Sequence, residues 1–304
     1  MEQLLRSLFQ SMAKSKSANR WAKRYGLHLG AQRFVAGETI QSAIEAIRQL
    51  NQQGMAATLD HLGEFVSDPA EARASADYGI RTLEAIYNSG VQSSLSLKLT
   101  QMGLDIDRTL CMENMHRILT AARELGLLVT IDMEDSRHCQ ETLDILDELR
   151  IDYKSVGTVI QSSLYRSIQD VKRLGEAGVH LRIVKGAYRE PASVAYQDKA
   201  DVDVNYIKLV ETHLKSPGFT AIATHDETIV NYALQFIEKF KFDKKTYEFQ
   251  MLYGIGTVLQ KKLVDEGYPV RVYVPYGNDW YGYFMRRLAE RPANVSFVLR
   301  GIFR

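Results

Sequence analysis

Two adjacent arginines near the end of the sequence could bind a small carboxylate. A guanidinium group offers a planar fork of donors that matches the two oxygens of a carboxylate. Arg286 and Arg287 stand in the segment YGYFMRRLAERPAN, with Tyr283 three residues before Arg286 and Glu290 four residues after it. In a helix these positions share a face, so the segment would present an aromatic ring, two guanidinium groups and a carboxylate together. A solvated surface pair between Arg286 and Glu290 is the alternative interpretation.

A second group of polar residues stands where short apolar runs end. Its members are Lys98, Asp132, Gln161, Arg182, Lys185, His225 and Tyr273. Each of them alone could be a hydrogen-bonded core residue, but their recurrence at equivalent places indicates one shared site. Lys98 and Asp132 could form a buried ion pair. Alternatively, Lys98 could bind a carboxylate.

Eight runs rich in β-branched residues would supply the strands that position these side chains. They are residues 55–60, 94–100, 128–133, 156–161, 181–187, 220–225, 247–252 and 271–276. Segments between them, such as 141–150 and 229–240, have apolar residues at helical spacing. Strands that alternate with helices predict an α/β fold, a (βα)8 barrel of the TIM type with its active site at the carboxyl ends of the strands. A doubly wound open sheet is the structural alternative.

Residues 1–50 have the pattern of a helical arm, which leaves residues 51–304 for the barrel. The arm contains a basic stretch with Lys14, Lys16, Arg20, Lys23 and Arg24. This stretch could be a weak docking surface for an anionic membrane. The pattern favours the alternative, a solvated helix face that covers the bottom of the barrel.

The composition indicates a globular chain with a sizeable core, because 45% of the residues are hydrophobic and 25% are charged. The net charge of +1 gives no long-range attraction to nucleic acid, so we expect no nucleic-acid partner. Cys111 and Cys139 have no C-x-x-C spacing and no neighbouring histidine cluster, so neither a disulfide framework nor a metal site is predicted. No run approaches the roughly 20 apolar residues that span a bilayer, and the first residues lack the pattern of a signal peptide. We therefore expect a cytoplasmic protein.

Sequence motifs of other enzyme classes are incomplete or absent. The segment GIGTVL at 254–259 has only part of a G-x-G-x-x-G pattern, and there is no Walker A, H-E-x-x-H or G-x-S-x-G motif. A lysine at a strand end can form a Schiff base, so a lyase or aldolase that uses Lys98 or Lys185 is one alternative function. A barrel that binds a carboxylated metabolite without turnover is another.

Several segments resemble the proline dehydrogenase family and occur in the family's order. They are SLKLTQMGLD, TIDMEDS, VIQSSLYRS, RIVKGAY, ATHDE, FQMLYGIG and RVYVPYG followed by YFMRRLAE. The resemblance covers roughly residues 30 to 300 and is closest to the short monofunctional bacterial enzymes. It implies a distorted (βα)8 barrel that binds FAD across its mouth. It also implies oxidation of L-proline to Δ1-pyrroline-5-carboxylate, with hydride transfer from ring C5 to flavin N5.

The resemblance assigns substrate-binding roles to Lys98, Leu252, Tyr273, Tyr283, Arg286 and Arg287. The lysine and the two arginines would bind the carboxylate of proline, and the two tyrosines and the leucine would enclose its ring. Asp132 would pair with Lys98, and Glu290 would brace the arginine pair near the flavin. The residues predicted as catalytic are Lys98, Asp132, Tyr273, Arg286 and Arg287.

The residues that would contact FAD are Gln161, Arg182, Val184, Lys185, Gly186, Ala187, Thr224, His225, Gln250, Leu252 and Glu290. Gln161 and Arg182 would contact the isoalloxazine ring, and Arg182 near N5 would favour the electron-rich reduced ring. The partners that the resemblance implies are a quinone that accepts the electrons and a separate pyrroline-5-carboxylate dehydrogenase that uses the product. A peripheral contact with the inner face of a membrane would bring the protein to the quinone.

Overall fold

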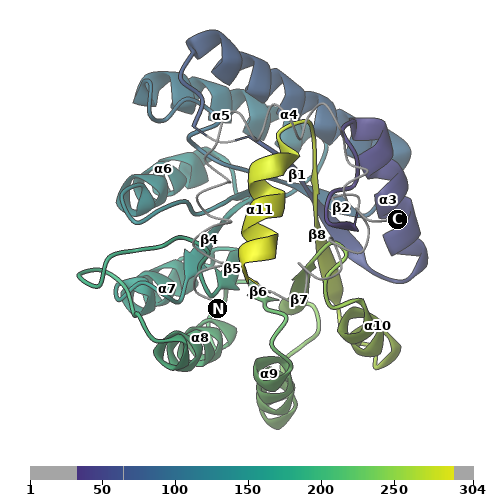
Figure 1. The fold of residues 1–304 in the computed structure, drawn as a ribbon, viewed down its shortest axis with the longest axis vertical. Helices are drawn as coiled ribbons and strands as arrows, with labels where there is room; N and C mark the ends of the chain where they lie inside the picture. Colours follow the sequence, from purple (N-terminus) through teal and green to yellow (C-terminus); the bar gives the residue numbers. More distant parts are fainter. Residues whose placement is uncertain (1–32, 64, 291–304) are drawn as a thin grey trace.

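Eight parallel strands form a closed barrel in sequence order, and the last strand pairs with the first (Figure 1). The computed structural model describes residues 33–63 and 65–290, of which 286–290 are described by their backbone alone. The strands are β1 (Ala56–His61), β2 (Ser93–Leu97), β3 (Val129–Ile131), β4 (Val156–Gln161), β5 (Leu181–Val184), β6 (Thr220–Ala223), β7 (Tyr247–Leu252) and β8 (Val270–Tyr276). The predicted barrel is confirmed, and the open-sheet alternative is wrong.

Four strands end two or three residues earlier than their sequence patterns predict. β2, β3, β5 and β6 end at Leu97, Ile131, Val184 and Ala223. Beyond these residues the chain leaves the neighbouring strand and enters a loop at the barrel mouth. The polar residues that close these runs therefore stand at the rim of the sheet.

Alternation along the strands turns polar side chains into the barrel interior. Arg182 on β5 donates to Gln250 Oε1 on β7 at 2.7 Å and to Ser96 Oγ on β2 at 3.4 Å. Only side chains that point inward can meet across strands that are not neighbours. Ile183 and Phe249, at the intervening positions, belong to the apolar core.

An outer ring of helices covers the strands. It contains α3 (Ile40–Gln52), α4 (Pro69–Ser89), α5 (Arg108–Glu124), α6 (Cys139–Asp152), α7 (Ser167–Glu176), α8 (Lys199–Leu214), α9 (Glu227–Phe240) and α10 (Thr257–Asp265). The helices predicted at 141–150 and 229–240 lie within α6 and α9. Asp68, Asp107 and Asp226 cap α4, α5 and α9 by accepting hydrogen bonds from first-turn backbone N–H groups.

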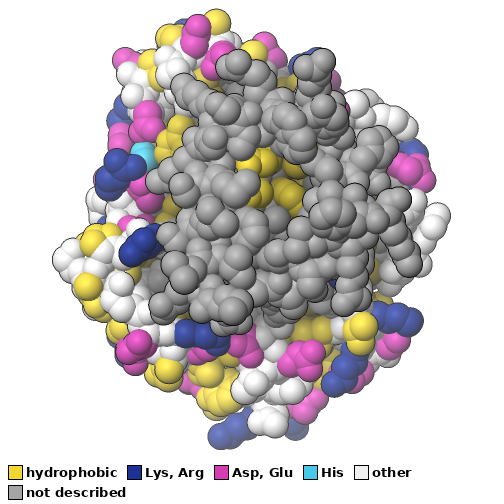
Figure 2. Space-filling view, in the orientation of Figure 1, with side chains coloured by type: hydrophobic (Ala, Val, Ile, Leu, Met, Phe, Trp, Pro, Cys, Tyr) yellow, Lys and Arg dark blue, Asp and Glu magenta, His cyan; other side chains and the backbone are white. Residues whose placement is uncertain are grey.

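The helix that follows β8, α11 (Trp280–Glu290), lies across the barrel mouth instead of beside the barrel (Figure 1). Its Trp280 and Phe284 belong to an apolar cluster with Leu62, which follows β1, and Ile255, which follows β7. Both partners stand at carboxyl ends of strands, so α11 covers that end. Hydrophobic side chains are visible at this place in the middle of the mouth face, and charged side chains of both signs surround the periphery (Figure 2). Because α11 lies over the mouth, α3 takes its place in the outer ring of helices, where it contacts both β1 and β8.

The predicted arm is described only in part. Its residues 40–50 belong to α3, whereas residues 1–32, including the whole basic stretch, lie outside the described residues. The division of the chain at residue 50 and both interpretations of the basic stretch stay predictions. Among the helices in the described part of the chain, none has the length and hydrophobicity to cross a membrane.

A buried histidine on α8 makes the stability of the barrel sensitive to acid. His213 is 0% exposed, its Nδ1 lies 2.8 Å from Thr220 Oγ1, and burial lowers its pKa from 6.5 to about 4. Below pH 6.5 the unfolded chain binds a proton at this residue that the folded chain does not bind. Stability is therefore lost as the pH falls from about 6.5 to about 4.

We expect the His213→Gln variant to lose less stability over this pH range than the unmodified protein. The slope of its unfolding free energy against pH should be smaller by up to about 1.4 kcal/mol per pH unit. Urea unfolding at a series of pH values measures both slopes, and above pH 7 the two curves should run parallel. Curves that stay parallel down to pH 4.5 would show that His213 is protonated in the folded protein.

Candidate active site

A cavity of about 1300 Å³ opens at the carboxyl ends of the strands. All the predicted site residues whose side chains the structure describes line it. They are Lys98, Asp132, Gln161, Arg182, Val184, Lys185, Gly186, Ala187, Thr224, His225, Gln250, Leu252, Tyr273 and Tyr283. The barrel thus brings residues from position 98 to position 283 of the sequence to one place. Their individual roles remain predictions.

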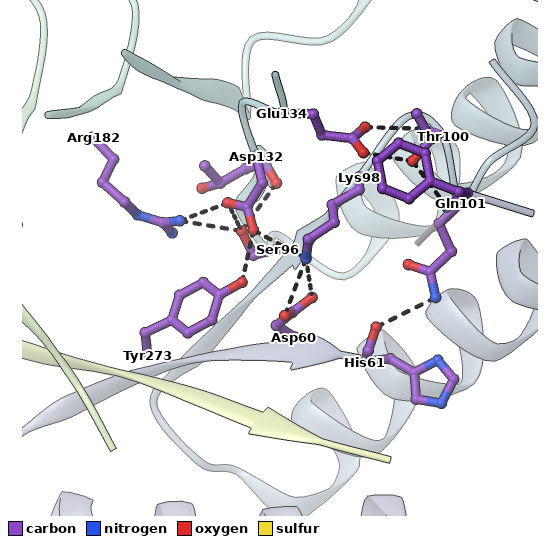
Figure 3. Close-up of polar contacts among 12 residues, drawn as sticks. Asp60, His61, Ser96, Lys98, Thr100, Gln101, Asp132, Glu134, Arg182 and Tyr273 are labelled. Atoms are coloured by element: carbon purple, nitrogen blue, oxygen red, sulfur yellow. Dashed lines mark hydrogen bonds and ion pairs between the residues drawn. The ribbon is translucent and has the colours of Figure 1, made fainter. Parts of the chain in front are cut away.

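Asp132, just beyond β3, is the centre of a hydrogen-bonded cluster (Figure 3). Its Oδ1 accepts hydrogen bonds from Ser96 Oγ and Arg182 Nη1, both at 2.7 Å, and its Oδ2 accepts one from the Tyr273 hydroxyl at 2.7 Å. Lys98 Nζ lies 3.6 Å from Oδ2, so the predicted ion pair is present. Burial acts to raise the pKa of Asp132, but Arg182, Lys98 and the hydrogen bonds together lower it below its ordinary value. Asp132 is therefore a carboxylate at neutral pH.

Asp60 lines the same cavity but is absent from the residues predicted from the sequence. Its Oδ1 and Oδ2 lie 3.1 and 3.2 Å from Lys98 Nζ, whereas the nearest oxygen of Asp132 lies 3.6 Å from that atom. Burial raises the pKa of Asp60 above its ordinary value, and the charge of Lys98 opposes this rise. The sequence did contain a signal for Asp60. It is the last residue of the apolar run MAATLD, and Asp132 stands at the corresponding place near the end of a later run.

Arg182 is fixed by a chain of contacts that continues below the mouth. Its Nε donates to Gln250 Oε1, and Gln250 Nε2 in turn donates to Glu248 Oε1, each at 2.7 Å. Glu248 also accepts a hydrogen bond from Arg271 Nε at 2.7 Å. The sequence patterns did not single out Ser96, Glu248 or Arg271, because each looks like an ordinary polar residue inside a strand. The predicted contact of Arg182 with flavin N5 stays a prediction.

Tyr273 packs its ring against Arg182, whose guanidinium carbon lies 5.1 Å from the ring centroid. Burial, together with the charges of Asp132 and Asp60, raises the pKa of Tyr273 well above its ordinary value. The hydroxyl therefore stays protonated and acts as a donor to Asp132.

A close approach between two loops shapes another part of the cavity wall. Gly186 has a φ of +110°, and an added Cβ there would overlap with Ser163 Oγ. Ser163 Oγ is buried and has no hydrogen-bond partner within residues 33–63 and 65–290. Both residues line the cavity. A polar ligand atom could bond this hydroxyl.

Two ionisable residues occupy the cavity wall near β6. Lys185 Nζ lies 2.8 Å from Asp226 Oδ2 and 2.5 Å from Asp203 Oδ1, so it forms ion pairs with two carboxylates. His225 Nε2 accepts a hydrogen bond from Leu252 N at 2.9 Å, so this ring nitrogen carries no proton.

An apolar and aromatic wall closes the cavity on the side of α11. Tyr283, on α11, is 6% exposed, and Leu252 pairs in register with Tyr273 between β7 and β8. The backbone of α11 continues as a helix through Arg286, Arg287 and Glu290, as the spacing predicts. Their side chains lie outside the described residues, so their contacts stay predictions.

The cavity can hold more than a small substrate. Its volume exceeds the roughly 300–1000 Å³ of ordinary small-molecule pockets. One part combines an ammonium group with aromatic side chains, which suits a small carboxylated ring. The part along the ends of β4 and β5 offers a glycine, a lysine and a hydroxyl that has no partner among the described residues, which suits an extended polar cofactor.

Comparison with known proteins identifies relatives that match this chain over its whole length. The model of the proline dehydrogenase family matches residues 43–300. Proline dehydrogenase 1 of Bacillus subtilis strain 168 is 44% identical over 301 residues, which is 99% of this chain and 100% of that protein. The proline dehydrogenase of Deinococcus radiodurans is 44% identical over 309 residues, which is 100% of this chain and 99% of that protein.

A solved structure shares the fold. It is the crystal structure of proline utilization A (PutA) from Bdellovibrio bacteriovorus inactivated by N-propargylglycine, with a TM-score of 0.80 and 26% identity. The similarity covers 86% of this chain but 32% of that protein, so the chain spans about a third of its length.

Proposed function

The chain belongs to the proline dehydrogenase family, and we propose that it oxidises L-proline to Δ1-pyrroline-5-carboxylate with FAD as its cofactor. Proline dehydrogenase activity is the first step of proline catabolism. FAD, when bound, supplies the two-electron acceptor at N5 for the hydride that leaves ring C5 of the substrate. The observation that supports this proposal most is the convergence of four residues in one cavity: Lys98 and Asp132 just beyond the ends of β2 and β3, and Arg182 and Tyr273 inside β5 and β8, although the sequence pattern places these two at strand ends.

In this proposal, cations bind the carboxylate of proline and apolar side chains enclose its ring. Lys98 would bind the carboxylate together with Arg286 and Arg287, because three cationic hydrogen-bond donors can hold one anion from several directions. Tyr273 and Tyr283 would pack against the ring methylenes, together with Leu252. Holding the substrate in a reactive orientation can lower the barrier by several kcal/mol, up to roughly 7–11 in well-oriented reactions.

The cavity residues fit FAD on grounds of shape and hydrogen bonding. Ser163 Oγ would gain a partner and Gly186 leaves space where a side chain would intrude, while Lys185, whose ammonium group is paired with Asp203 and Asp226, lines the same part of the cavity. The other residues that we propose for the cofactor site are Gln161, Arg182, Val184, Ala187, Thr224, His225, Gln250, Leu252 and Glu290. Gln161 is already held, since its Nε2 donates to Glu134 O at 2.7 Å.

The geometry does not favour a Schiff-base lysine. Such a lysine needs an uncharged amine to attack a carbonyl group. Lys98 and Lys185 both lie against carboxylates in ion pairs, which hold them as ammonium groups.

Anaerobic titration of the purified protein with L-proline tests the proposed function. We expect a yellow protein whose oxidised-flavin absorption is bleached by stoichiometric proline. Subsequent addition of a soluble quinone without oxygen should restore the oxidised spectrum. A colourless protein, or a flavin spectrum that proline leaves unchanged, would refute the proposal. Trapping of substrate on a lysine by borohydride would favour the Schiff-base alternative instead.

We also propose that a quinone takes the electrons and that a separate pyrroline-5-carboxylate dehydrogenase uses the product. The second proposal is supported by the full-length match to relatives named simply as proline dehydrogenases. Cytoplasmic location with peripheral contact at a membrane is a further proposal, and the basic stretch expected to make that contact lies in the part of the chain that is not described.

A further inference from the structure

Asp60 and Lys98 form a buried ion pair at the wall of the cavity (Figure 3). Asp60 is 1% exposed on β1, and Lys98 is 7% exposed just beyond β2. Both carboxylate oxygens accept a hydrogen bond from the ammonium group, at 3.1 and 3.2 Å. Donation from one ammonium group to both oxygens is the arrangement of a charge-assisted ion pair, and the charge of Lys98 opposes the rise in the pKa of Asp60 that burial causes.

Asp132 cannot take the place of Asp60 in this arrangement. It lies 3.6 Å from Lys98 Nζ, beyond ordinary hydrogen-bond distance. Its two oxygens already accept hydrogen bonds from Ser96, Arg182 and Tyr273. Arg182 compensates its charge, so among the carboxylates of the described residues Asp60 is the one that lies closest to Lys98 and compensates it.

We propose that Asp60 is a positioning residue for substrate binding, which keeps the Lys98 ammonium group charged and directed so that it can bind the carboxylate of proline. This inference rests on the proposed function, in which Lys98 binds that carboxylate. Without Asp60 the buried ammonium group would lose its main counter-charge, and shedding its proton would relieve the cost. A neutral amine would be a much weaker partner for a carboxylate.

Over the tested range, pH 7 to 9, the groups around Lys98 leave it as the one whose loss of a proton is expected once Asp60 is removed, because burial disfavours an ammonium group that has lost this counter-charge. Within the described residues, Asp132 has a lowered pKa, Tyr273 has a pKa raised well above 10 by burial, and His61 has a pKa lowered to about 4 by burial. Arg182 stays charged at any such pH. Glu134 accepts two hydrogen bonds from Thr100, as a carboxylate does.

The test measures binding of tetrahydrofuran-2-carboxylate to the FAD-loaded protein by calorimetry across this pH range. The analogue has a ring oxygen where proline has its amine, so it does not itself titrate there. For the Asp60→Asn variant we expect affinity that falls at least tenfold from pH 7 to pH 9, whereas the unmodified protein should change little. The Asp60→Asn/Lys98→Met double variant should bind weakly with no such pH dependence.

Simple electrostatics predicts the opposite result, which makes the test decisive. If Asp60 contributed only a negative charge, its removal would attract the carboxylate analogue more strongly at every pH. Tighter binding by the Asp60→Asn variant, or an unchanged pH profile, would overturn the inference. Asp170→Asn is the matched control, because Asp170 is a buried partner of Arg166 on α7 and does not line the cavity. It should leave affinity and pH profile unchanged.

Two further variants separate this inference from the proposed function and from misfolding. If Lys98→Met alone leaves analogue binding intact, the proposed role of Lys98 in binding the carboxylate is wrong. If Lys98→Met weakens binding but Asp60→Asn changes neither the affinity nor its pH dependence, only the proposed role of Asp60 is refuted. If the Asp60→Asn variant does not fold with FAD, Asp60→Glu takes its place. Glutamate keeps the charge but displaces it, so binding should weaken without a new pH dependence. If the Asp60→Glu variant bound the analogue as tightly as the unmodified protein, the proposed positioning role of Asp60 would be wrong.

Discussion

Replacement of Asp132 by asparagine is expected to lower kcat/KM for L-proline by about 100- to 1000-fold. Asp132 is the counter-charge of the buried Arg182, at 2.7 Å, and it also lies 3.6 Å from the ammonium group of Lys98. Removing one partner of a buried charge pair costs about 3–5 kcal/mol, and about 1.4 kcal/mol corresponds to a factor of ten. We expect part of this cost as lost stability and the rest as lost activity, because Lys98, Arg182 and Tyr273 would no longer keep their positions.

Steady-state kinetics with an artificial electron acceptor, together with the flavin content, measures this effect. Ser96→Ala is the matched control, since it removes one neutral donor to the same Oδ1 and leaves every charge in place. Loss of that hydrogen bond should cost about 0.5–1.5 kcal/mol, or roughly tenfold at most. An Asp132→Asn variant with activity within threefold of the unmodified protein would show that this carboxylate does not organise the site.

Replacement of Arg286 by lysine should raise the KM for L-proline by about 10- to 100-fold while FAD is retained. Lysine keeps the positive charge but loses the planar fork that binds both oxygens of a carboxylate. A hydrogen bond to a charged group contributes about 1.5–3 kcal/mol, which sets the expected range. The prediction rests on the family resemblance and on the helical spacing of the arginine segment. The helical backbone of α11 confirms that spacing.

Kinetics at saturating acceptor, with the flavin-to-protein ratio measured in parallel, checks this prediction. Arg173→Lys is a suitable control, because Arg173 forms an exposed ion pair with Asp147 on the outer ring and does not line the cavity. An unchanged KM in the Arg286→Lys variant would remove Arg286 from the carboxylate site. A fall in kcat with unchanged KM would instead give this residue a role confined to the transition state.

The cluster at the mouth consists of two opposed ion pairs, so its formal charges cancel. Lys98 with Asp60 and Arg182 with Asp132 account for the four charges. A neutral cluster does not attract an anion over a long distance, but it holds each charged group in a fixed direction. We therefore expect the arginine pair of α11 to supply the net attraction for the carboxylate and Lys98 to supply a directed contact.

The barrel follows from local patterns in the sequence. Each of the eight runs, for example VGTVIQ at 156–161, has the β-branched residues of a buried strand, and the intervening segments have helical spacing. The polar residue that closes a run marks the barrel mouth, because the strands are parallel and all their carboxyl ends lie on one side. This rule places Lys98 and Asp132 correctly, and it applies equally to Asp60.

Other features depend on contacts between distant parts of the chain. The pattern of α11 shows an amphipathic helix but not the surface that it covers, and only packing against Leu62 and Ile255 puts it over the mouth. The ion pair between Glu248 and Arg271 cannot be recognised in a single strand either, because each residue is paired with a residue of the neighbouring strand.

The sequence by itself determined the order of strands and helices and the chemistry at the ends of the strands. Hydrophobic period and residue type act over a few neighbours, so one short segment is enough to reveal them. The tertiary structure alone decided which carboxylate faces which cation, such as Asp60 with Lys98 and Arg182 with Asp132. These pairings depend on which strands become neighbours and on how far each side chain reaches inside the closed barrel, and no local pattern contains either quantity.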